Sequence, residues 1–208
     1  MMLTIIDCGS GNIRSLVKIL EKVGAEVRVA EDADGVKDAE MIVLPGVGHF
    51  ATAMKELERR GLVEALREKV VGRGVPFLGV CLGMQLLARR SEEGDVAGLG
   101  WVDADCVRFD FSGHEQALKI PNMGWRGIAA TDGSPLFPPF DRPWRFYFVH
   151  GYHMRGDDPG MVMATADYGG PFTAAVAVGN IVGVQFHPEK SHRFGVAFFE
   201  NYLRAFSP

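Results

Sequence analysis

Apolar runs and amphipathic stretches alternate along the first ninety residues. Four runs have the length and residue types of β-strands: residues 3–7, 26–30, 41–44 and 75–80. Helical spacing of apolar positions predicts helices at residues 13–20, 50–60, 62–71 and 83–90. Pro45 is expected to end the third strand, because proline has no N–H to donate to a sheet. This order predicts a parallel sheet with helices on both faces.

The second half of the chain has a different pattern. Strands are expected at residues 101–111, 118–120, 146–149, 162–166, 172–178 and 181–186, several of them antiparallel and joined by Gly, Asn or Asp turns. Residues 131–145 hold four prolines and are predicted to form a loop, before a last helix at 194–206. We therefore expect an α/β fold in a single domain, residues 1–208. Its central sheet should be mostly parallel and flanked by helices, with an antiparallel, strand-rich second half.

Composition narrows the class of protein. The 208 residues are 47% hydrophobic and carry a formal charge of −4, which argues against broad binding to nucleic acid or anionic membranes. The apolar start is too short for a secretory signal, and Gly179-Asn180 divides the uncharged stretch 172–188 into two strands rather than a membrane span. Three scattered cysteines fit neither a disulfide framework nor a thiolate zinc site. A cytoplasmic location is expected, with no cofactor and no metal.

The segment G-V-C-L-G at residues 79–83 is the most informative part of the sequence. It has the G-x-S-x-G nucleophile-elbow pattern with Cys81 in place of serine, between an apolar strand and a helix. Such a turn lifts the side chain out of the sheet, and the helix N-terminus favours a thiolate. The alternative is that Cys81 is a small apolar residue packed behind a helix, as Cys106 and Cys8 are expected to be.

A cysteine nucleophile requires a base, and His187 has the most suitable position of the six histidines. It follows the apolar strand 181–186, and Pro188 stiffens the chain after it. Glu189 is two residues further on, so in an extended segment it points the same way and can orient the imidazole. The alternatives are a structural histidine at a strand end, or a zinc site of the H-x-E type. The zinc deaminases also need P-C-x-x-C, which this sequence lacks.

Attack on an amide carbonyl creates an oxyanion that needs hydrogen-bond donors. The N–H of Leu82, next to the nucleophile, is one expected donor. The P-G-V-G loop at residues 45–48 can bring a second, from Val47, to the same cleft. The alternative for this loop is an ordinary strand-to-helix turn.

These segments together resemble the triad-type (class I) glutamine amidotransferases over nearly the whole chain. The carrying segments are residues 45–48, 79–87, 91–93, 123–125, 147–150, 179–181 and 185–191. Within this family, the G-M-Q, M-G-W and F-V-H segments most resemble the glutaminase subunits of imidazole glycerol phosphate synthases. The resemblance implies hydrolysis of glutamine to glutamate, with ammonia passed to a cyclase subunit in a heterodimer that serves histidine biosynthesis.

The resemblance also implies roles for individual residues. It implies a catalytic triad of Cys81, His187 and Glu189. It implies that the glutamine substrate is bound by Gln85, Glu93 and Gly48, and that the partner subunit faces Asn12, Trp125, Tyr147 and Lys190.

Two positions depart from the pattern of the family, and two further functions stay open. Asn122 stands where the family usually has histidine, and Gly151 where serine or threonine is common. Glutaminase subunits that serve anthranilate or GMP synthesis are one alternative. A catalytically silent relative that acts as a regulatory binding partner is the other.

Overall fold

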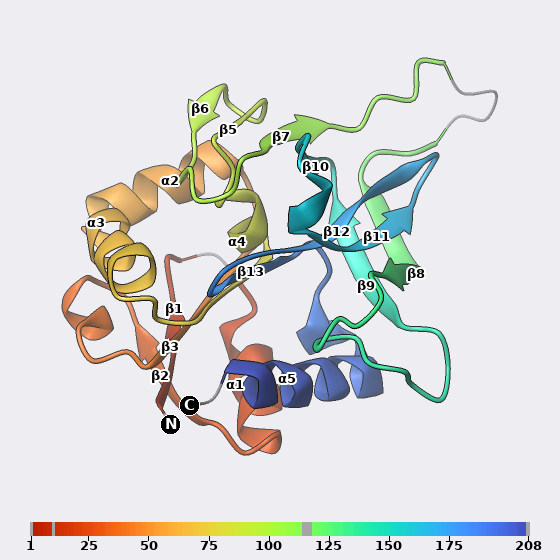
Figure 1. Ribbon diagram of the computed structural model, residues 1–208. Helices are drawn as coiled ribbons and strands as arrows, with labels where there is room; N and C mark the ends of the chain where they lie inside the picture. The colour runs from red at the N-terminus through yellow and green to blue at the C-terminus, as the bar shows by residue number, and fades with distance from the viewer. Residues whose placement is uncertain (1, 10, 114–117, 207–208) are drawn as a thin grey trace.

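The computed structural model describes residues 2–9, 11–113 and 118–206, which form a layered α/β structure around a large mixed sheet (Figure 1). The strands of this nine-stranded sheet lie in the order β2 (Glu26–Ala30), β1 (Met2–Ile6), β3 (Met41–Gly46), β4 (Phe77–Cys81), β13 (Ile181–Val184), β12 (Pro171–Val178), β11 (Val162–Asp167), β8 (Asn122–Ala130) and β9 (Arg145–His150). From β2 to β13 neighbouring strands are parallel, and from β13 to β9 they are antiparallel. The expected α/β fold is confirmed.

A smaller sheet and the helices cover the large sheet. The smaller sheet has the order β10 (Tyr152–Arg155), β7 (Asp105–Arg108), β5 (Arg90–Ser91) and β6 (Val96–Ala97). The α-helices are α1 (Ile13–Lys22), α2 (Phe50–Arg59), α3 (Leu62–Arg67), α4 (Leu82–Gln85) and α5 (His192–Phe206). A π-helical turn, η2 (Glu68–Gly72), extends α3, and short 3₁₀ turns form η1 (Asp34–Val36), η3 (Pro159–Met161) and η4 (Pro188–Lys190).

Two hydrophobic cores occupy the two faces of the sheet. Helices α1 and α5 lie on one face, whereas α2, α3, α4 and the smaller sheet lie on the other (Figure 1). Adjacent residues of β3 show why the parallel strands are apolar throughout: Val43 packs in the first core and Ile42 in the second. Successive side chains of a strand point to opposite faces, so a strand covered on both sides needs apolar residues at every position.

Three predictions about individual elements were wrong. Pro45 does not end β3, which continues to Gly46. At this point β3 pairs with β4 and no longer with β1, so the missing N–H of Pro45 costs no ladder hydrogen bond on that side. The helix expected at 83–90 ends at Gln85, because the buried residues after it turn towards β5. Residues 118–120 form no strand, whereas β8, which was not predicted, begins at Asn122.

Most other predicted elements occur within a few residues of their expected bounds. The proline-rich segment 131–145 is a loop up to the start of β9, and α5 begins two residues earlier than expected. The strand expected at 101–111 is shorter, as β7, and β10 was not predicted. Among the residues described, no helix combines the length and apolar character needed to cross a membrane.

An aromatic cluster beneath β9 and β13 supports the end of the sheet that carries His187. Phe198 of α5 is fully buried and packs against Phe146 and Phe186, which stack with ring centroids 3.8 Å apart.

We expect Phe198→Ala to lower the free energy of unfolding by about 3–5 kcal/mol, because it leaves a large cavity. Urea unfolding followed by tryptophan fluorescence measures this loss. Phe140→Ala is the matched control: Phe140 is 38% exposed, so its substitution should lower the free energy of unfolding by clearly less. Equal losses in both variants would contradict the prediction.

Candidate active site

Cys81 ends β4 and immediately precedes α4, in a backbone conformation that a residue with a side chain rarely adopts. Its φ of 55° and ψ of −107° lie in a strained, sparsely populated region of backbone dihedral angles. Strain of this kind persists only where the surrounding structure enforces it. The sequence-based expectation of a nucleophile elbow therefore matches the local backbone. The Cys81 side chain is 5% exposed and lines a cavity, rather than being sealed beneath the helix.

The two glycines of the motif are required by close approach of the backbone. A Cβ at Gly83 would lie 1.8 Å from the carbonyl oxygen of Leu44, and one at Gly79 would lie 2.5 Å from the carbonyl oxygen of Gly83. Both distances are far inside van der Waals contact. The start of α4 is thus pressed against β3 and β4, and this contact fixes the position of the Cys81 sulfur.

His187 and Glu189 form a buried pair at the end of β13. Nδ1 of His187 lies 2.9 Å from Oε1 of Glu189, and the two side chains are 2% and 5% exposed. The main-chain N–H of His187 donates to the carbonyl of Tyr147 at 2.9 Å, which ties this segment to β9. Because the carboxylate accepts from Nδ1, the other ring nitrogen, Nε2, is left to face a different group.

The structure brings Cys81 and His187 together across neighbouring strands. In the register of β4 and β13, Val80 pairs with Val184, so the two strand ends lie side by side. Nε2 of His187 is buried and has no hydrogen-bond partner among the described residues. Burial lowers the pKa of His187, but negative charge on the Cys81 sulfur and on Glu189 outweighs burial and raises this pKa to about 10. The His187 ring is therefore held as an imidazolium beside the sulfur of the proposed nucleophile.

A cavity of about 170 Å³ opens in front of the Cys81 sulfur. It is lined by Val47, Gly48, Cys81, Leu82, Gln85, Glu93, Val149, His150, Gly151 and Tyr152. This volume equals roughly six water molecules at about 30 Å³ each, which suits a ligand the size of one amino acid. Both predicted oxyanion donors, Leu82 and Val47, and all three predicted substrate residues line this one cavity.

Gln85 and Glu93 also have structural partners that the sequence did not indicate. The Nε2 group of Gln85 donates to the carbonyl of Tyr152 at 3.0 Å and to Oε1 of Gln185 at 3.1 Å. One carboxylate oxygen of Glu93 accepts from the N–H of Phe50, the first residue of α2, at 2.7 Å. An anion at a helix N-terminus is stabilising, so Glu93 serves this helix as well as facing the cavity.

His150 lines the cavity but was not singled out from the sequence. Its Nδ1 lies 2.7 Å from the carbonyl of Tyr152, and its Nε2 lies 3.0 Å from Nδ2 of Asn122. Burial lowers the pKa of His150 to about 3, so the ring is neutral. Oδ1 of Asn122 accepts from Arg126 at 2.5 Å, which makes Nδ2 the donor to His150. Asn122, the departure from the family pattern, thus fixes the tautomer of a cavity residue.

The predicted partner-facing residues gather mainly in one exposed aromatic surface. Trp125 is 36% exposed, packs edge-on against Tyr147, and stacks on His192 with centroids 5.6 Å apart. The Lys190 ammonium lies 5.9 Å from the Tyr147 ring centroid. Asn12 is elsewhere, at the start of α1, where its side chain caps no helical N–H. We call Trp125, Tyr147, Lys190 and His192 the aromatic surface.

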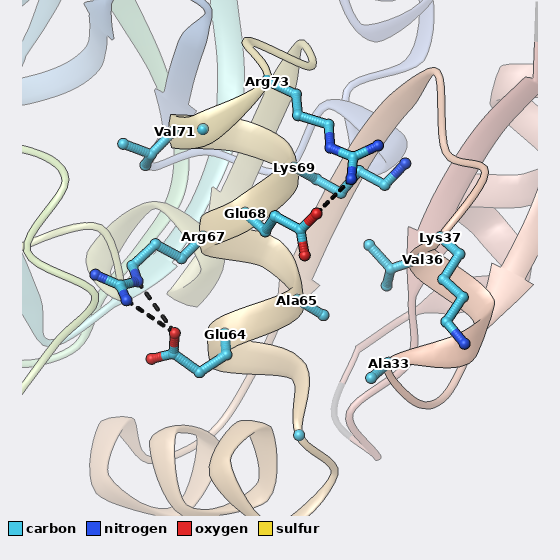
Figure 2. Close-up of a pocket in the computed structure, with 12 residues that line it drawn as sticks. Ala33, Val36, Lys37, Glu64, Ala65, Arg67, Glu68, Lys69, Val71 and Arg73 are labelled. Carbon is cyan, nitrogen blue, oxygen red and sulfur yellow. Dashed lines mark hydrogen bonds and ion pairs between the residues drawn. The ribbon is translucent and has the colours of Figure 1, made fainter.

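A larger cavity lies away from this chemistry. It measures about 990 Å³ and lies between η1 and the α3–η2 helix (Figure 2). Four of the charged side chains along it form two ion pairs: Glu64 with Arg67, and Glu68 with Arg73. They are also largely exposed to solvent. No cysteine, serine or histidine among the described residues lines this cavity, so the smaller cavity at Cys81 is the candidate active site.

Among the residues that the structure describes, the remaining cysteines and histidines do not line the cavity. Cys8 and Cys106 are buried, and burial raises the pKa of the Cys106 thiol to about 12. His49 precedes α2, and His153 lies in the smaller sheet against Phe109. His114 lies outside the described residues. Within the described ranges, no group of three or more His, Cys, Asp or Glu side chains is placed to hold a metal ion.

Comparisons with known proteins agree with the geometry. The family model described as glutamine amidotransferase class-I matches residues 4–205. The chain is 44% identical over 202 residues to imidazole glycerol phosphate synthase subunit HisH 2 of Pseudomonas aeruginosa, which covers 97% of this chain and 98% of that protein. It is also 44% identical over 213 residues to subunit HisH of Rhodospirillum rubrum, covering 98% and 99%.

Solved structures of other proteins share the fold of this chain. A crystal structure of a glutamine amidotransferase superposes with a TM-score of 0.76 at 19% identity, covering 99% of both chains. The structure of PurLQS from Thermotoga maritima gives a TM-score of 0.74 at 20% identity, covering 98% of both chains. With a cysteine elbow, a His–Glu pair and a family model that spans nearly its whole length, this chain belongs to the class-I glutamine amidotransferases.

Proposed function

We propose that the chain is the glutaminase subunit of an imidazole glycerol phosphate synthase. In this proposal it hydrolyses glutamine to glutamate and hands the ammonia to a cyclase subunit, as a step of histidine biosynthesis. The observation that carries the proposal is the His187–Glu189 pair beside the sulfur of Cys81, which itself lines a small cavity. The relatives at 44% identity, whose names include HisH, favour this synthase over those for anthranilate or GMP.

The first half of the proposed reaction releases ammonia. The Cys81 thiolate attacks the side-chain amide carbon of glutamine, and the carbonyl oxygen becomes an oxyanion. The N–H groups of Leu82 and Val47 are proposed to stabilise it, and one such donor is worth about 3 kcal/mol. The C–N bond then breaks as the His187 imidazolium gives its Nε2 proton to the leaving nitrogen. The products are ammonia and a thioester on Cys81.

The second half regenerates the site. His187, now neutral, accepts a proton from water at Nε2 as the water oxygen attacks the thioester carbon. The C–S bond breaks, glutamate leaves, and the thiolate and imidazolium re-form. Glu189 keeps Nδ1 as the protonated nitrogen throughout and stabilises the imidazolium in each half. Gln85, Glu93 and Gly48 are proposed to hold the amino-acid end of the substrate, since they line the same cavity.

The released ammonia explains why a partner is needed. In water, ammonia takes up a proton and loses the lone pair that the acceptor reaction uses, so transfer across a water-excluding interface is favoured. The aromatic surface, together with Asn12, is proposed to face the cyclase in a heterodimer. Its large aromatic side chains are typical of the buried centres of interfaces. A cytoplasmic location and a single domain over residues 1–208 stay predictions.

Loss of the proposed nucleophile tests the function directly. We expect Cys81→Ala to lower glutamine hydrolysis by at least about 10³-fold, because no other group near the cavity can form the thioester. Glutamate release, assayed with a ligand-bound cyclase subunit present, measures this. Cys106→Ala is the matched control: Cys106 is buried and does not line the cavity, so this variant should leave the rate unchanged. A Cys81→Ala chain that works at the normal rate would end the proposal.

If Glu189 orients His187, its substitution should change both kcat and the titration of the His187 ring. We expect Glu189→Gln to lower kcat by about 10²–10⁴-fold, because the imidazole loses the group that orients it. Its charge helps to raise the pKa of His187, so without it the ring should lose its proton at a lower pH than in the wild-type chain. NMR titration of the His187 ring measures this shift. The exposed Glu200→Gln on α5 is the control. An unmoved His187 titration would contradict the assignment.

If the aromatic surface faces the partner, a substitution there should lower the affinity for the cyclase and leave the triad residues in place. We expect Trp125→Ala to weaken cyclase binding by at least about 30-fold, which corresponds to about 2 kcal/mol for a central aromatic residue. Isothermal titration calorimetry measures the affinity. Val29→Ala is the control and should bind normally, because Val29 is similarly exposed but lies on β2, the edge strand at the other end of the sheet. If Trp125→Ala binds as tightly as the wild-type chain, the aromatic surface is not the interface.

A further inference from the structure

A buried glutamine that takes no part in the proposed triad lies behind the Cys81 sulfur. Gln185 is completely buried and follows β13 directly, beside the end of β4. The register of these strands pairs Val184 with Val80, which places Gln185 next to Cys81. Its main-chain N–H donates to the carbonyl of Ala174, and its side-chain Nε2 lies 3.8 Å from the Cys81 sulfur.

The directions of the hydrogen bonds around Gln185 are set by a main-chain carbonyl. The Tyr152 carbonyl can only accept, so Gln85 must present its Nε2 to it. The same Nε2 also lies against Oε1 of Gln185, and this second contact uses its remaining hydrogen. Flipping the Gln85 side-chain amide would place its Oε1 against the carbonyl oxygen of Tyr152. Turning Gln185 round would set two N–H₂ groups against each other.

The only consistent arrangement aims an N–H of Gln185 at the sulfur. With Oε1 occupied as an acceptor, Nε2 of Gln185 is the group that lies against Cys81. A hydrogen bond to an ionised acceptor is about twice as strong as one between neutral groups, so this donor favours the thiolate over the thiol. The pair is buried, and a low local dielectric strengthens the effect.

We propose that Gln185 is a further catalytic residue, whose Nε2–H donates to the Cys81 sulfur and stabilises it as a thiolate. This inference rests on the proposed glutaminase function and deepens it. The donor acts before attack, by increasing the fraction of ionised sulfur. It acts again when the C–S bond of the thioester breaks and the electron pair returns to the sulfur. Gln85 holds Gln185 in place, and its own Oε1 is left free to accept from the substrate.

Alkylation of Cys81 across pH separates this role from a purely structural one. The full-length chain is treated with iodoacetamide from pH 5 to 10, and the modification rate of the peptide that contains Cys81 is followed by mass spectrometry. In Gln185→Met, which has no N–H to donate, we expect the midpoint of the pH dependence to rise by about one unit. That change is a tenfold loss of thiolate at any pH well below the midpoint. Gln185→Glu should raise the midpoint further, because it also adds negative charge.

A matched variant controls for the loss of a buried amide. Asn201 is buried on α5 and donates from Nδ2 to the carbonyl of Leu136, far from the cavity lining. Asn201→Met should lower stability yet leave the Cys81 midpoint unchanged. If both Gln185 variants lose stability with an unmoved midpoint, Gln185 is only a packing residue and the inference is overturned.

A measurement on the wild-type chain keeps the inference testable if the variants fold poorly. The side-chain ¹⁵N–¹H signal of Gln185 should shift as Cys81 ionises, and a signal that stays constant would overturn the donor role. None of these measurements needs glutamine or a cyclase. Suppose that the Gln185 variants shift the midpoint of Cys81 alkylation but the wild-type chain hydrolyses no glutamine with its partner. That result would refute the proposed function and leave the donor role of Gln185 in place.

Discussion

The close contact between the start of α4 and the end of β3 is the constraint on which the site depends. Gly83 lies so near the Leu44 carbonyl that no side chain fits between them, and Cys81 takes up a left-handed backbone as a result. A strained residue of this kind costs about 1–3 kcal/mol. Buried strands on both sides of β4 offset that cost and hold the sulfur in one position. The geometry of the proposed nucleophile is thus determined by the core and not by a loop.

A polar network buried in that core determines which atoms stay free. Gln85, Gln185 and His150 satisfy one another or main-chain carbonyls, whereas Nε2 of His187 has no partner among the described residues. An unpaired buried polar atom costs about 1–3 kcal/mol, so such atoms are rare unless a ligand completes them. Here the unpaired nitrogen faces the sulfur that the proposed reaction uses. The network holds its neighbours fixed, so that this nitrogen is left for proton transfer.

Local patterns predicted much of the fold and singled out the residues of the proposed triad, and the failures share a physical cause. The elbow glycines and the H-P-E segment are contiguous in sequence, so their geometry could be inferred from spacing. The helix expected at 83–90 failed because Leu86, Leu87 and Ala88 are buried on all sides, and a continuous apolar run does not distinguish a helix from a buried turn. Gln185 was missed because only the pairing of distant strands places it against Cys81. Glu93 was assigned to the substrate alone because its contact with α2 is tertiary.

Strand β9 connects the proposed interface to the proposed base. Tyr147 presents its ring to the aromatic surface, while its carbonyl accepts the N–H of His187 and its N–H donates to Ser191. The Ser191 hydroxyl in turn donates to the carbonyl of His187, which closes a ring of hydrogen bonds around the segment that carries the proposed base. A partner that displaced Tyr147 would therefore act on the backbone that carries the imidazole. Coupling between two sites needs contacts that differ between two states, and this shared strand supplies the contacts through which a bound cyclase would act on the glutaminase site.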